Sequence, residues 1–324
     1  MTVDLGVFLD LRNPAWCARP WAEHYRRALH IAETADATLD SVWLSEHHFF
    51  SDGYLTQPLA FAAAVAARTK RVRIGTGVLL AALRQPLHIA EEAVIVDLVS
   101  GGRLELGFGA GYRRLEYEAA GADFAGRFRA TDEAVESVRT LLRSVTPPPI
   151  QQPIPMWLGY GSPSGAFRAG MYGVGLLSVD RALHEPYLRG LAAGGHDVST
   201  ARMGGLVDFI VTDDPERATA RLRPHLVHQL ETYRAYRFED PAKPAPLTVT
   251  AESLAALEVA GTPVPGTKVL TPEQAGALLL QVTRGLPVTH VYCWASISGM
   301  PDDMVDRHLE LLANEVRPAL QGAT

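Results

Sequence analysis

The chain has 324 residues, of which 47% are hydrophobic and 20% are charged, and its formal net charge is −6. This is the composition of a globular protein, and so mild and dispersed a charge argues against nucleic acid or an anionic membrane surface as a partner. No apolar run approaches the roughly 20 residues of a membrane span, and the two distant cysteines, Cys17 and Cys293, predict a reduced, cytoplasmic setting.

Strand-like and helix-like patterns alternate along the whole chain. The predicted strands cover residues 3–8, 42–44, 72–80, 104–107, 156–158, 174–178, 206–211 and 290–295. The predicted helices cover residues 21–37, 57–68, 86–100, 127–143, 164–171, 215–236 and 302–315. Strands that alternate with helices in this way predict an α/β fold, a single (β/α)8 TIM barrel spanning residues 1–324. Residues 240–267 contain five prolines and fit no such unit, so they are interpreted as an insertion that could serve as a lid.

The most informative stretch follows the second predicted strand, where Glu46, His47 and His48 stand at the start of a loop. In a β/α barrel, residues that directly follow a strand lie at the catalytic end. Side chains alternate along a strand, so Glu46 and His48 are expected on one side and His47 on the other. Only one of the two histidines can then point into the barrel mouth. The alternative interpretation is a pair of solvated or capping histidines.

Glycine is concentrated where strands end. Gly75 and Gly77 weaken the third strand, which favours either the close approach of a flat ligand ring or a β-bulge. The turn at residues 107–112, G-F-G-A-G-Y, lacks the G-x-G-x-x-G spacing and is weak evidence for a nicotinamide site. Neither zinc-type spacing nor a P-loop occurs in the sequence, so no metal site is predicted.

The turn at residues 159–165, G-Y-G-S-P-S-G, joins the fifth strand to a helix and is the best candidate for a phosphate site. Free backbone N–H groups at a helix start, together with hydroxyl groups, bind a dianionic phosphate well. The alternative is that Ser162 only caps the helix. The residues assigned to the site are Gly161, Ser162, Ser164 and Gly165, with Arg129 as a second phosphate ligand.

The chain resembles the bacterial luciferase-like flavin-dependent oxidoreductases, whose fold is a β/α barrel. The resemblance rests on motifs that occur in the family's order over nearly the whole chain. They are V-W-L-S-E-H-H-F at 42–49, R-I-G-T-G-V at 73–78, Q-P-L-H-I-A-E-E at 85–92, D-L-V-S-G-G-R-L-E-L-G-F-G-A-G-Y at 97–112, P-M-W-L-G-Y-G-S at 155–162, G-G-H-D at 194–197, T-P-E-Q at 271–274 and E-V-R-P at 315–318.

The resemblance implies a flavin at the barrel mouth. His47 matches the family's active-site histidine, with Glu46 beside it to orient it. Gly77 and Val78 match an unusual peptide that supports the flavin ring. The turn containing Gly109, Ala110 and Gly111 also belongs to the cofactor site, but many relatives that use FMN carry an arginine where this chain has Ala110. The loss of that phosphate contact leaves both FMN and the deazaflavin F420 as candidate cofactors.

Three functions follow from the resemblance. The favoured one is a monooxygenase that uses reduced FMN, supplied by a separate reductase, and O2 to oxygenate a small organic substrate. The alternatives are an F420-dependent hydride-transfer oxidoreductase and a flavin-binding protein without catalysis. The resemblance also implies a homodimer that pairs through residues 57–68 and 86–100.

Overall fold

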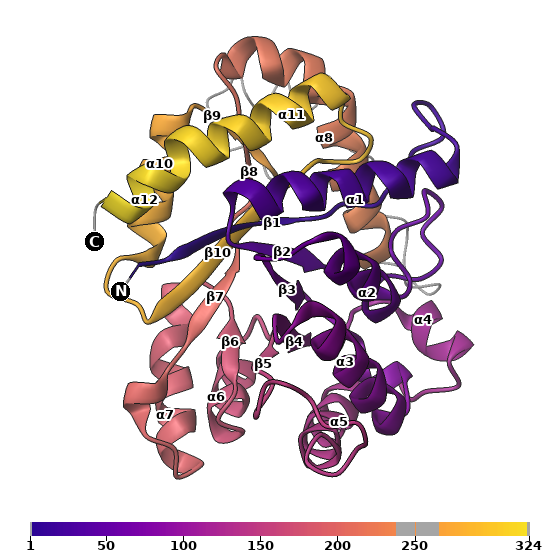
Figure 1. The fold of residues 1–324 in the computed structure, drawn as a ribbon, viewed down its shortest axis with the longest axis vertical. Helices are drawn as coiled ribbons and strands as arrows, with labels where there is room; N and C mark the ends of the chain where they lie inside the picture. The colour runs from indigo at the N-terminus through magenta and orange to yellow at the C-terminus, as the bar shows by residue number, and fades with distance from the viewer. Residues whose placement is uncertain (1, 238–249, 251–265, 323–324) are drawn as a thin grey trace.

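A computed structural model describes residues 2–237, 250 and 266–322. At its centre lies a closed barrel of eight parallel strands, ringed by helices (Figure 1), in the order β1-β10-β7-β6-β5-β4-β3-β2. The predicted (β/α)8 barrel is therefore confirmed. The strands are β1 (Asp4–Phe8), β2 (Ser41–Leu44), β3 (Arg73–Thr76), β4 (Leu104–Phe108), β5 (Met156–Leu158), β6 (Gly175–Leu177), β7 (Met203–Leu206) and β10 (Val288–Trp294).

The helices cover the outside of the barrel. Several of them begin with a proline in the first turn, where a missing N–H does not interrupt the helix. The predicted helices are present, while α4, α7, α10 and α12 were not predicted. The helices are α1 (Trp21–Thr38), α2 (Pro58–Arg68), α3 (Pro86–Ser100), α4 (Arg114–Ala119), α5 (Arg127–Leu141), α6 (Pro163–Met171), α7 (His184–Ala193), α8 (Pro215–Arg237), α10 (Pro272–Thr283), α11 (Asp302–Leu311) and α12 (Arg317–Gly322).

The single strand predicted at residues 206–211 is wrong in detail. The barrel strand there is β7, whereas β8 (Phe209–Val211) pairs in parallel with β9 (Lys268–Leu270) in a separate two-stranded sheet. β7 was missed because its glycines have a low propensity for strands. Gly204 is nevertheless needed, because a Cβ atom there would lie 2.4 Å from Cε1 of His290. Most of the insertion predicted at residues 240–267 lies outside the described residues.

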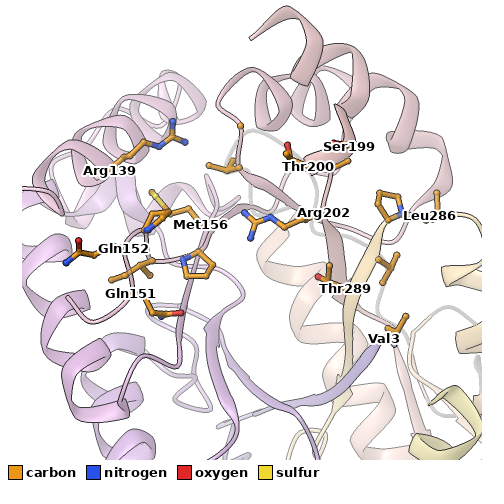
Figure 2. Close-up of a pocket in the computed structure, with 18 of the residues that line it drawn as sticks. Val3, Arg139, Gln151, Gln152, Met156, Ser199, Thr200, Arg202, Leu286 and Thr289 are labelled. Atoms are coloured by element: carbon orange, nitrogen blue, oxygen red, sulfur yellow. The ribbon is translucent and has the colours of Figure 1, made fainter. Parts of the chain in front are cut away.

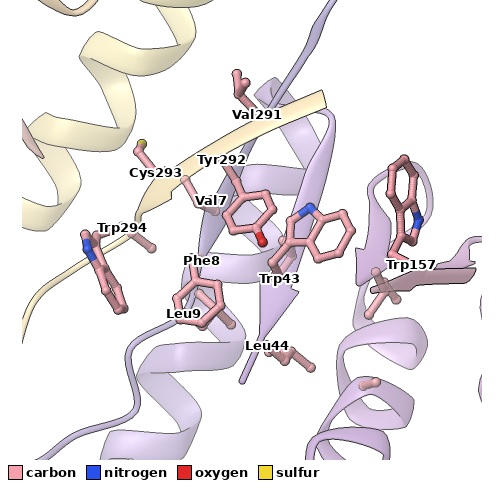
Figure 3. Packing of buried hydrophobic residues seen from close by; sticks show 14 of the residues in the cluster. Val7, Phe8, Leu9, Trp43, Leu44, Trp157, Val291, Tyr292, Cys293 and Trp294 are labelled. Carbon is pink, nitrogen blue, oxygen red and sulfur yellow. The ribbon is translucent and has the colours of Figure 1, made fainter. Parts of the chain in front are cut away.

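Large rings fill the barrel interior. The ring of Trp43 stacks on both Tyr292 and His290 with centroids 4.7 Å apart, and Trp157 meets His290 edge-on at the same distance. Figure 3 shows Tyr292 and Trp43 side by side, with Trp157 beyond Trp43. Trp157 is buried and fills part of the barrel interior. Offset and edge-to-face ring pairs of this kind stabilise a core by about 0.5–1.5 kcal/mol each beyond their buried area.

Gly75 belongs to this packed interior. A Cβ atom at Gly75 would lie 2.3 Å from the ring of Trp43, so only glycine leaves room for the indole. This packing role replaces both interpretations of Gly75 made from the sequence, the approach of a ligand and a bulge. Of the two glycines, only Gly77 lies at the mouth of the barrel.

Candidate functional site

The polar residues after β2 divide between two sides of the chain, as strand alternation predicts. Oε1 of Glu46 lies 3.0 Å from Nε2 of His48, and its Oε2 accepts a 2.8 Å hydrogen bond from the backbone N–H of Leu80. Glu46 therefore joins the loop after β2 to the loop after β3. It holds His48, and the expectation that Glu46 orients His47 is corrected, because the two side chains leave opposite sides of the strand end.

His47 stands in an aromatic enclosure. Its ring centroid lies 4.8 Å from that of Phe50, 4.6 Å from Tyr54, 5.7 Å from Tyr112 and 6.1 Å from Tyr233. Its side chain is 14% exposed. These rings shield the imidazole from bulk water while leaving part of it accessible, which suits a group that exchanges a proton with a bound molecule.

The carboxylate beside His47 is that of Glu116, a residue that the sequence analysis missed. Oε1 of Glu116 lies 3.8 Å from Nδ1 of His47 and accepts a 2.9 Å hydrogen bond from the backbone N–H of His48. Glu116 is buried and lies on the short helix α4, where no pattern in the sequence distinguishes it from neighbouring acidic residues. Only the fold brings it to the loop after β2.

One wall of the enclosure comes from α8. The hydroxyl groups of Tyr54 and Tyr233 lie 2.9 Å apart, and the guanidinium of Arg12 lies 5.1 Å from the centroid of each ring. Arg12 is fully buried and pairs with the buried Asp10 at 3.0 Å. Burial raises the pKa of the Tyr54 and Tyr233 phenols, so both remain neutral hydrogen-bonding groups at physiological pH.

Tyr112 offers a free polar group at the same place. Its hydroxyl oxygen is buried and has no hydrogen-bond partner in the part of the chain that the structure describes. Burial also raises the pKa of this phenol. A buried hydroxyl without a partner is costly unless a ligand or water satisfies it, so Tyr112 is a second group, after His47, that a bound molecule would contact.

A cradle for a flat ring lies beside this enclosure. The peptide bond between Gly77 and Val78 is cis, which matches the unusual peptide that the resemblance implied. Val78 is flanked by bare backbone, because a Cβ would lie 2.4 Å from Val78 Cγ2 at Gly109 and 2.6 Å from Cγ1 at Gly159. Gly77, Val78, Gly159 and Tyr292 line a cavity of about 810 Å³, which loop residues after β6 and part of α10 complete.

The rest of the glycine-rich turn supports this cradle. Ala110 is buried, and its carbonyl accepts a 2.6 Å hydrogen bond from the hydroxyl of Tyr117. Gly111 adopts a positive φ of 61°, a conformation that favours glycine. Ala110 contributes a buried methyl group and no charge at the position where many relatives place an arginine.

The predicted phosphate turn opens into a second cavity at the mouth. Ser162 caps α6 by accepting a 3.2 Å hydrogen bond from the N–H of Gly165, and its Oγ lies 3.2 Å from that of Ser164. The capping role and an exposed hydroxyl are thus both present, and a Cβ at Gly161 would meet only open space. The cavity has a volume of about 650 Å³ and is lined by Phe128, Ser162, Pro163, Ser164, Phe167, Arg168 and Arg189.

The structure places Arg129, the predicted second phosphate ligand, outside the lining of this cavity. Its side chain is 75% exposed and pairs with Glu133 one helical turn away. Phe128 lines the cavity, and the next residue of an α-helix points about 100° away from it. The cations at the cavity are Arg168, which also lies 3.2 Å from Asp132, and Arg189.

Among the described residues, no helix is long and apolar enough to cross a membrane. Nor do the described histidine, cysteine and acidic side chains form a group of three that could hold a metal ion.

Sequence comparisons agree with this geometry. The family described as luciferase-like monooxygenase matches residues 3–264. The chain is 36% identical over 122 residues to 4-hydroxyprotoasukamycin monooxygenase of Streptomyces nodosus subsp. asukaensis, covering 37% of this chain and 33% of that protein. It is 28% identical over 159 residues to the oxygenase component of flavin-dependent trigonelline monooxygenase of Acinetobacter baylyi, covering 43% and 44%. The chain thus aligns with less than half of the length of these two relatives.

Solved structures share the fold over the full length. The monooxygenase RslO1 from Streptomyces bottropensis superposes with a TM-score of 0.77 at 22% identity, covering 98% of this chain and 99% of that one. An F420-dependent secondary alcohol dehydrogenase superposes with a TM-score of 0.73 at 19% identity, covering 99% of each chain. Similarity at these identities establishes the fold and leaves the reaction open.

Proposed function

The chain belongs to the luciferase-like monooxygenase family and is an oxidoreductase, and from this premise we propose that it uses reduced FMN and O2 to oxygenate a small organic substrate. The observation that carries the proposal is the pair of cavities at the mouth. Gly159 lines the cradle around Val78, and Ser162, three residues later, lines the serine- and arginine-rich cavity. A ring in the first and a phosphate in the second would be joined by a short flexible chain, which is the shape of FMN.

The residues present fit this cofactor. Gly109 and Gly159 leave room for the side chain of Val78, which lines the cavity that would hold a flat ring. At the other end, two serine hydroxyls, the N-terminal N–H groups of α6 and the guanidinium groups of Arg168 and Arg189 suit a dianionic phosphate. When bound there, reduced FMN supplies the electrons that activate O2.

The chain's own contribution to the reaction is proton handling and the exclusion of water. His47 is the side chain placed to exchange a proton, because it is partly accessible and has an acidic neighbour in Glu116 at 3.8 Å. The rings of Phe50, Tyr54 and Tyr233 keep bulk water from the imidazole. Tyr112 presents a hydroxyl group to the same space.

The test is an anaerobic titration of the purified protein with reduced FMN and, separately, reduced F420. We expect tighter binding of reduced FMN, followed by O2-dependent turnover when a flavin reductase is added. Tighter binding of reduced F420, with hydride transfer to a substrate in the absence of O2, would replace the proposal with its main alternative. Tight flavin binding without turnover of any substrate in aerated assays would indicate a flavin-binding protein without catalysis.

The F420 alternative has one specific observation in its favour. Ala110 is buried, and its carbonyl accepts a hydrogen bond from the hydroxyl of Tyr117. It offers the cofactor no positive charge at the position where many FMN-dependent relatives have an arginine. Arg168 and Arg189 offset this loss on the other side of the site. For that reason we favour FMN.

We also propose that the protein is a cytoplasmic homodimer. The outward face of α3 carries an apolar stripe in which Leu87, Ile95 and Val99 are 45%, 49% and 49% exposed. Large apolar side chains that are exposed along one helix face of a globular protein can form part of a protein–protein interface. The stripe lies on one of the two helices through which a dimer was predicted from the sequence.

A further inference from the structure

A third cavity lies at the opposite end of the barrel from His47. Its volume is about 1430 Å³, larger than either cavity at the mouth. Its walls are the segments that lead into β5, β6, β7 and β10, so it opens at the amino ends of these strands (Figure 2). In β/α barrels this end normally contributes stability and not catalysis, and a well-packed barrel bottom would leave no such space.

The charge of this cavity is one-sided. Four arginines line it, namely Arg139, Arg143, Arg202 and Arg284, and no aspartate or glutamate is among its described lining residues. Arg139 is already paired with Glu136 at 3.1 Å. Within the described chain, the other three have no carboxylate within ion-pair distance. A concave site with uncompensated positive charge concentrates anions.

Arg202 is the arginine best placed to bind a ligand. It directly precedes β7, is half-buried, and extends across the cavity toward Met156 (Figure 2). Its guanidinium lies 4.9 Å from the ring centroid of Trp157, and Trp157 is itself held by a 2.6 Å hydrogen bond from Nε1 to Glu105. This cation–π contact holds the guanidinium over the indole while its N–H groups remain available to an anion.

Much of the remaining wall is apolar. It is formed by Val3, Ile154, Pro155, Met156, Leu286 and Pro287, and the polar part consists of the amides of Gln151 and Gln152 and hydroxyl groups such as that of Thr200. A small inorganic anion would leave this apolar surface exposed to water. A molecule with an apolar body and a carboxylate or sulfonate group would cover it and also satisfy the cation.

We propose that this cavity is a second ligand site, which binds an organic anion with an apolar body and places the anionic group on Arg202. The site is separate from the mouth, and the proposal does not depend on which cofactor binds there. The half-buried guanidinium without a carboxylate partner is the feature that an anion would complete, because a desolvated charge is stabilised by a hydrogen-bonded counter-charge.

The probes for the test are two fluorescent molecules with the same apolar body. 8-Anilinonaphthalene-1-sulfonate carries an anionic group, and N-phenyl-1-naphthylamine lacks it. We expect saturable binding of the sulfonate and at least tenfold weaker binding of the neutral probe, since one charge-assisted hydrogen bond is worth about a factor of ten. Equal affinity for both probes, or no saturable binding of the sulfonate, would overturn the proposal.

Variants then assign the binding to this cavity. Arg202→Gln is expected to weaken sulfonate binding about tenfold, whereas Arg26→Gln, on the exposed face of α1, and Arg168→Gln, at the mouth, leave it unchanged. If Arg202→Gln does not fold, the double variant Arg143→Gln/Arg284→Gln at the rim decides, with a loss of threefold or more expected. Binding that survives in the folded arginine variants, or that falls in Arg168→Gln, places the probe elsewhere and refutes the site.

Discussion

The Nδ1 atom of His47 lies 3.8 Å from Oε1 of Glu116, a separation too long for a hydrogen bond but short enough for strong charge interaction. That oxygen is already engaged with the backbone N–H of His48. The Glu116 carboxylate is therefore held beside the imidazole by the loop backbone and not by a hydrogen bond to the imidazole itself. This relationship yields the first two predictions.

His47→Ala is expected to retain flavin binding, with a dissociation constant within about threefold of wild type, and to lower kcat by about 100- to 10,000-fold, the usual contribution of a positioned acid or base. Steady-state kinetics and flavin titration measure the two quantities. His30→Ala is the matched control, since His30 is exposed on α1. Unchanged turnover in His47→Ala would remove this residue from the mechanism.

Glu116→Gln tests whether the carboxylate beside His47 takes part in turnover. The amide keeps an oxygen for the N–H of His48 but removes the carboxylate that lies 3.8 Å from the imidazole. We expect kcat to fall about tenfold while the dissociation constant of the flavin stays within about threefold of wild type. Glu118→Gln, exposed on the same helix, is the control. An unchanged kcat would mean that Glu116 only supports the loop.

The phosphate assignment is tested by comparing FMN with riboflavin, which differ only in the phosphate group. Arg168→Gln is expected to weaken FMN binding about tenfold by removing a charge-assisted contact, and to leave riboflavin binding unchanged. Arg129→Gln is the control because Arg129 is exposed and paired with Glu133. If Arg129→Gln discriminates between the ligands and Arg168→Gln does not, the phosphate lies elsewhere.

Stability is expected to fall as the solution is acidified. Burial lowers the pKa of His290 and of His308 to about 4, from an ordinary value of 6.5. Between these values the unfolded chain binds protons that the folded chain excludes, so the free energy of unfolding decreases as the pH falls from about 6.5 to 4. Each histidine contributes on the order of 3 kcal/mol over that range.

Urea unfolding at several pH values measures this slope. His290→Phe keeps the stacking on Trp43 while removing one of the two groups, and it should reduce the slope by about half, with His308 supplying the remainder. His88→Gln, an exposed histidine on α3, should leave the slope unchanged. If the slope for His290→Phe equalled that of wild type, His290 would bind its proton as readily in the folded chain as in the unfolded chain.

The proposed dimer is tested at the apolar stripe of α3. Light scattering is expected to give twice the chain mass for wild type. Val99→Asp places a charge in that interface and should yield a folded monomer, while Glu91→Asp retains the dimer. A monomeric wild type at concentrations of tens of micromolar would exclude this assembly.

The sequence predicted those features that depend on local patterns. Alternation of strands and helices fixed the barrel, and alternation along a strand placed His47 opposite Glu46 and His48. The turn beginning at Gly159 also lies where a strand–turn–helix pattern puts it, with Ser162 at the start of α6. Each of these conclusions depends on residues that are close together in the chain.

Features that depend on tertiary contacts were missed. Glu116 reaches the loop after β2 only through the fold, and Arg189 of α7 joins Ser162 and Arg168 of α6 because the two helices pack together. The sequence gives no measure of helix rotation relative to a neighbouring element, and this is why Arg129 was chosen in their place. The anion site escaped notice for the same reason, since Arg139 and Arg143 come from the end of α5, Arg202 from the segment before β7 and Arg284 from the end of α10.

The pairing of β8 with β9 has an evolutionary consequence. The chain leaves the barrel after β7 and returns toward it through two adjacent, hydrogen-bonded segments, Phe209–Val211 and Lys268–Leu270. Residues inserted or deleted between the paired strands β8 and β9 need not displace any barrel strand. Related proteins can therefore differ in the segment between Val211 and Lys268, and so in substrate preference, while the barrel that carries the catalytic residues stays unchanged.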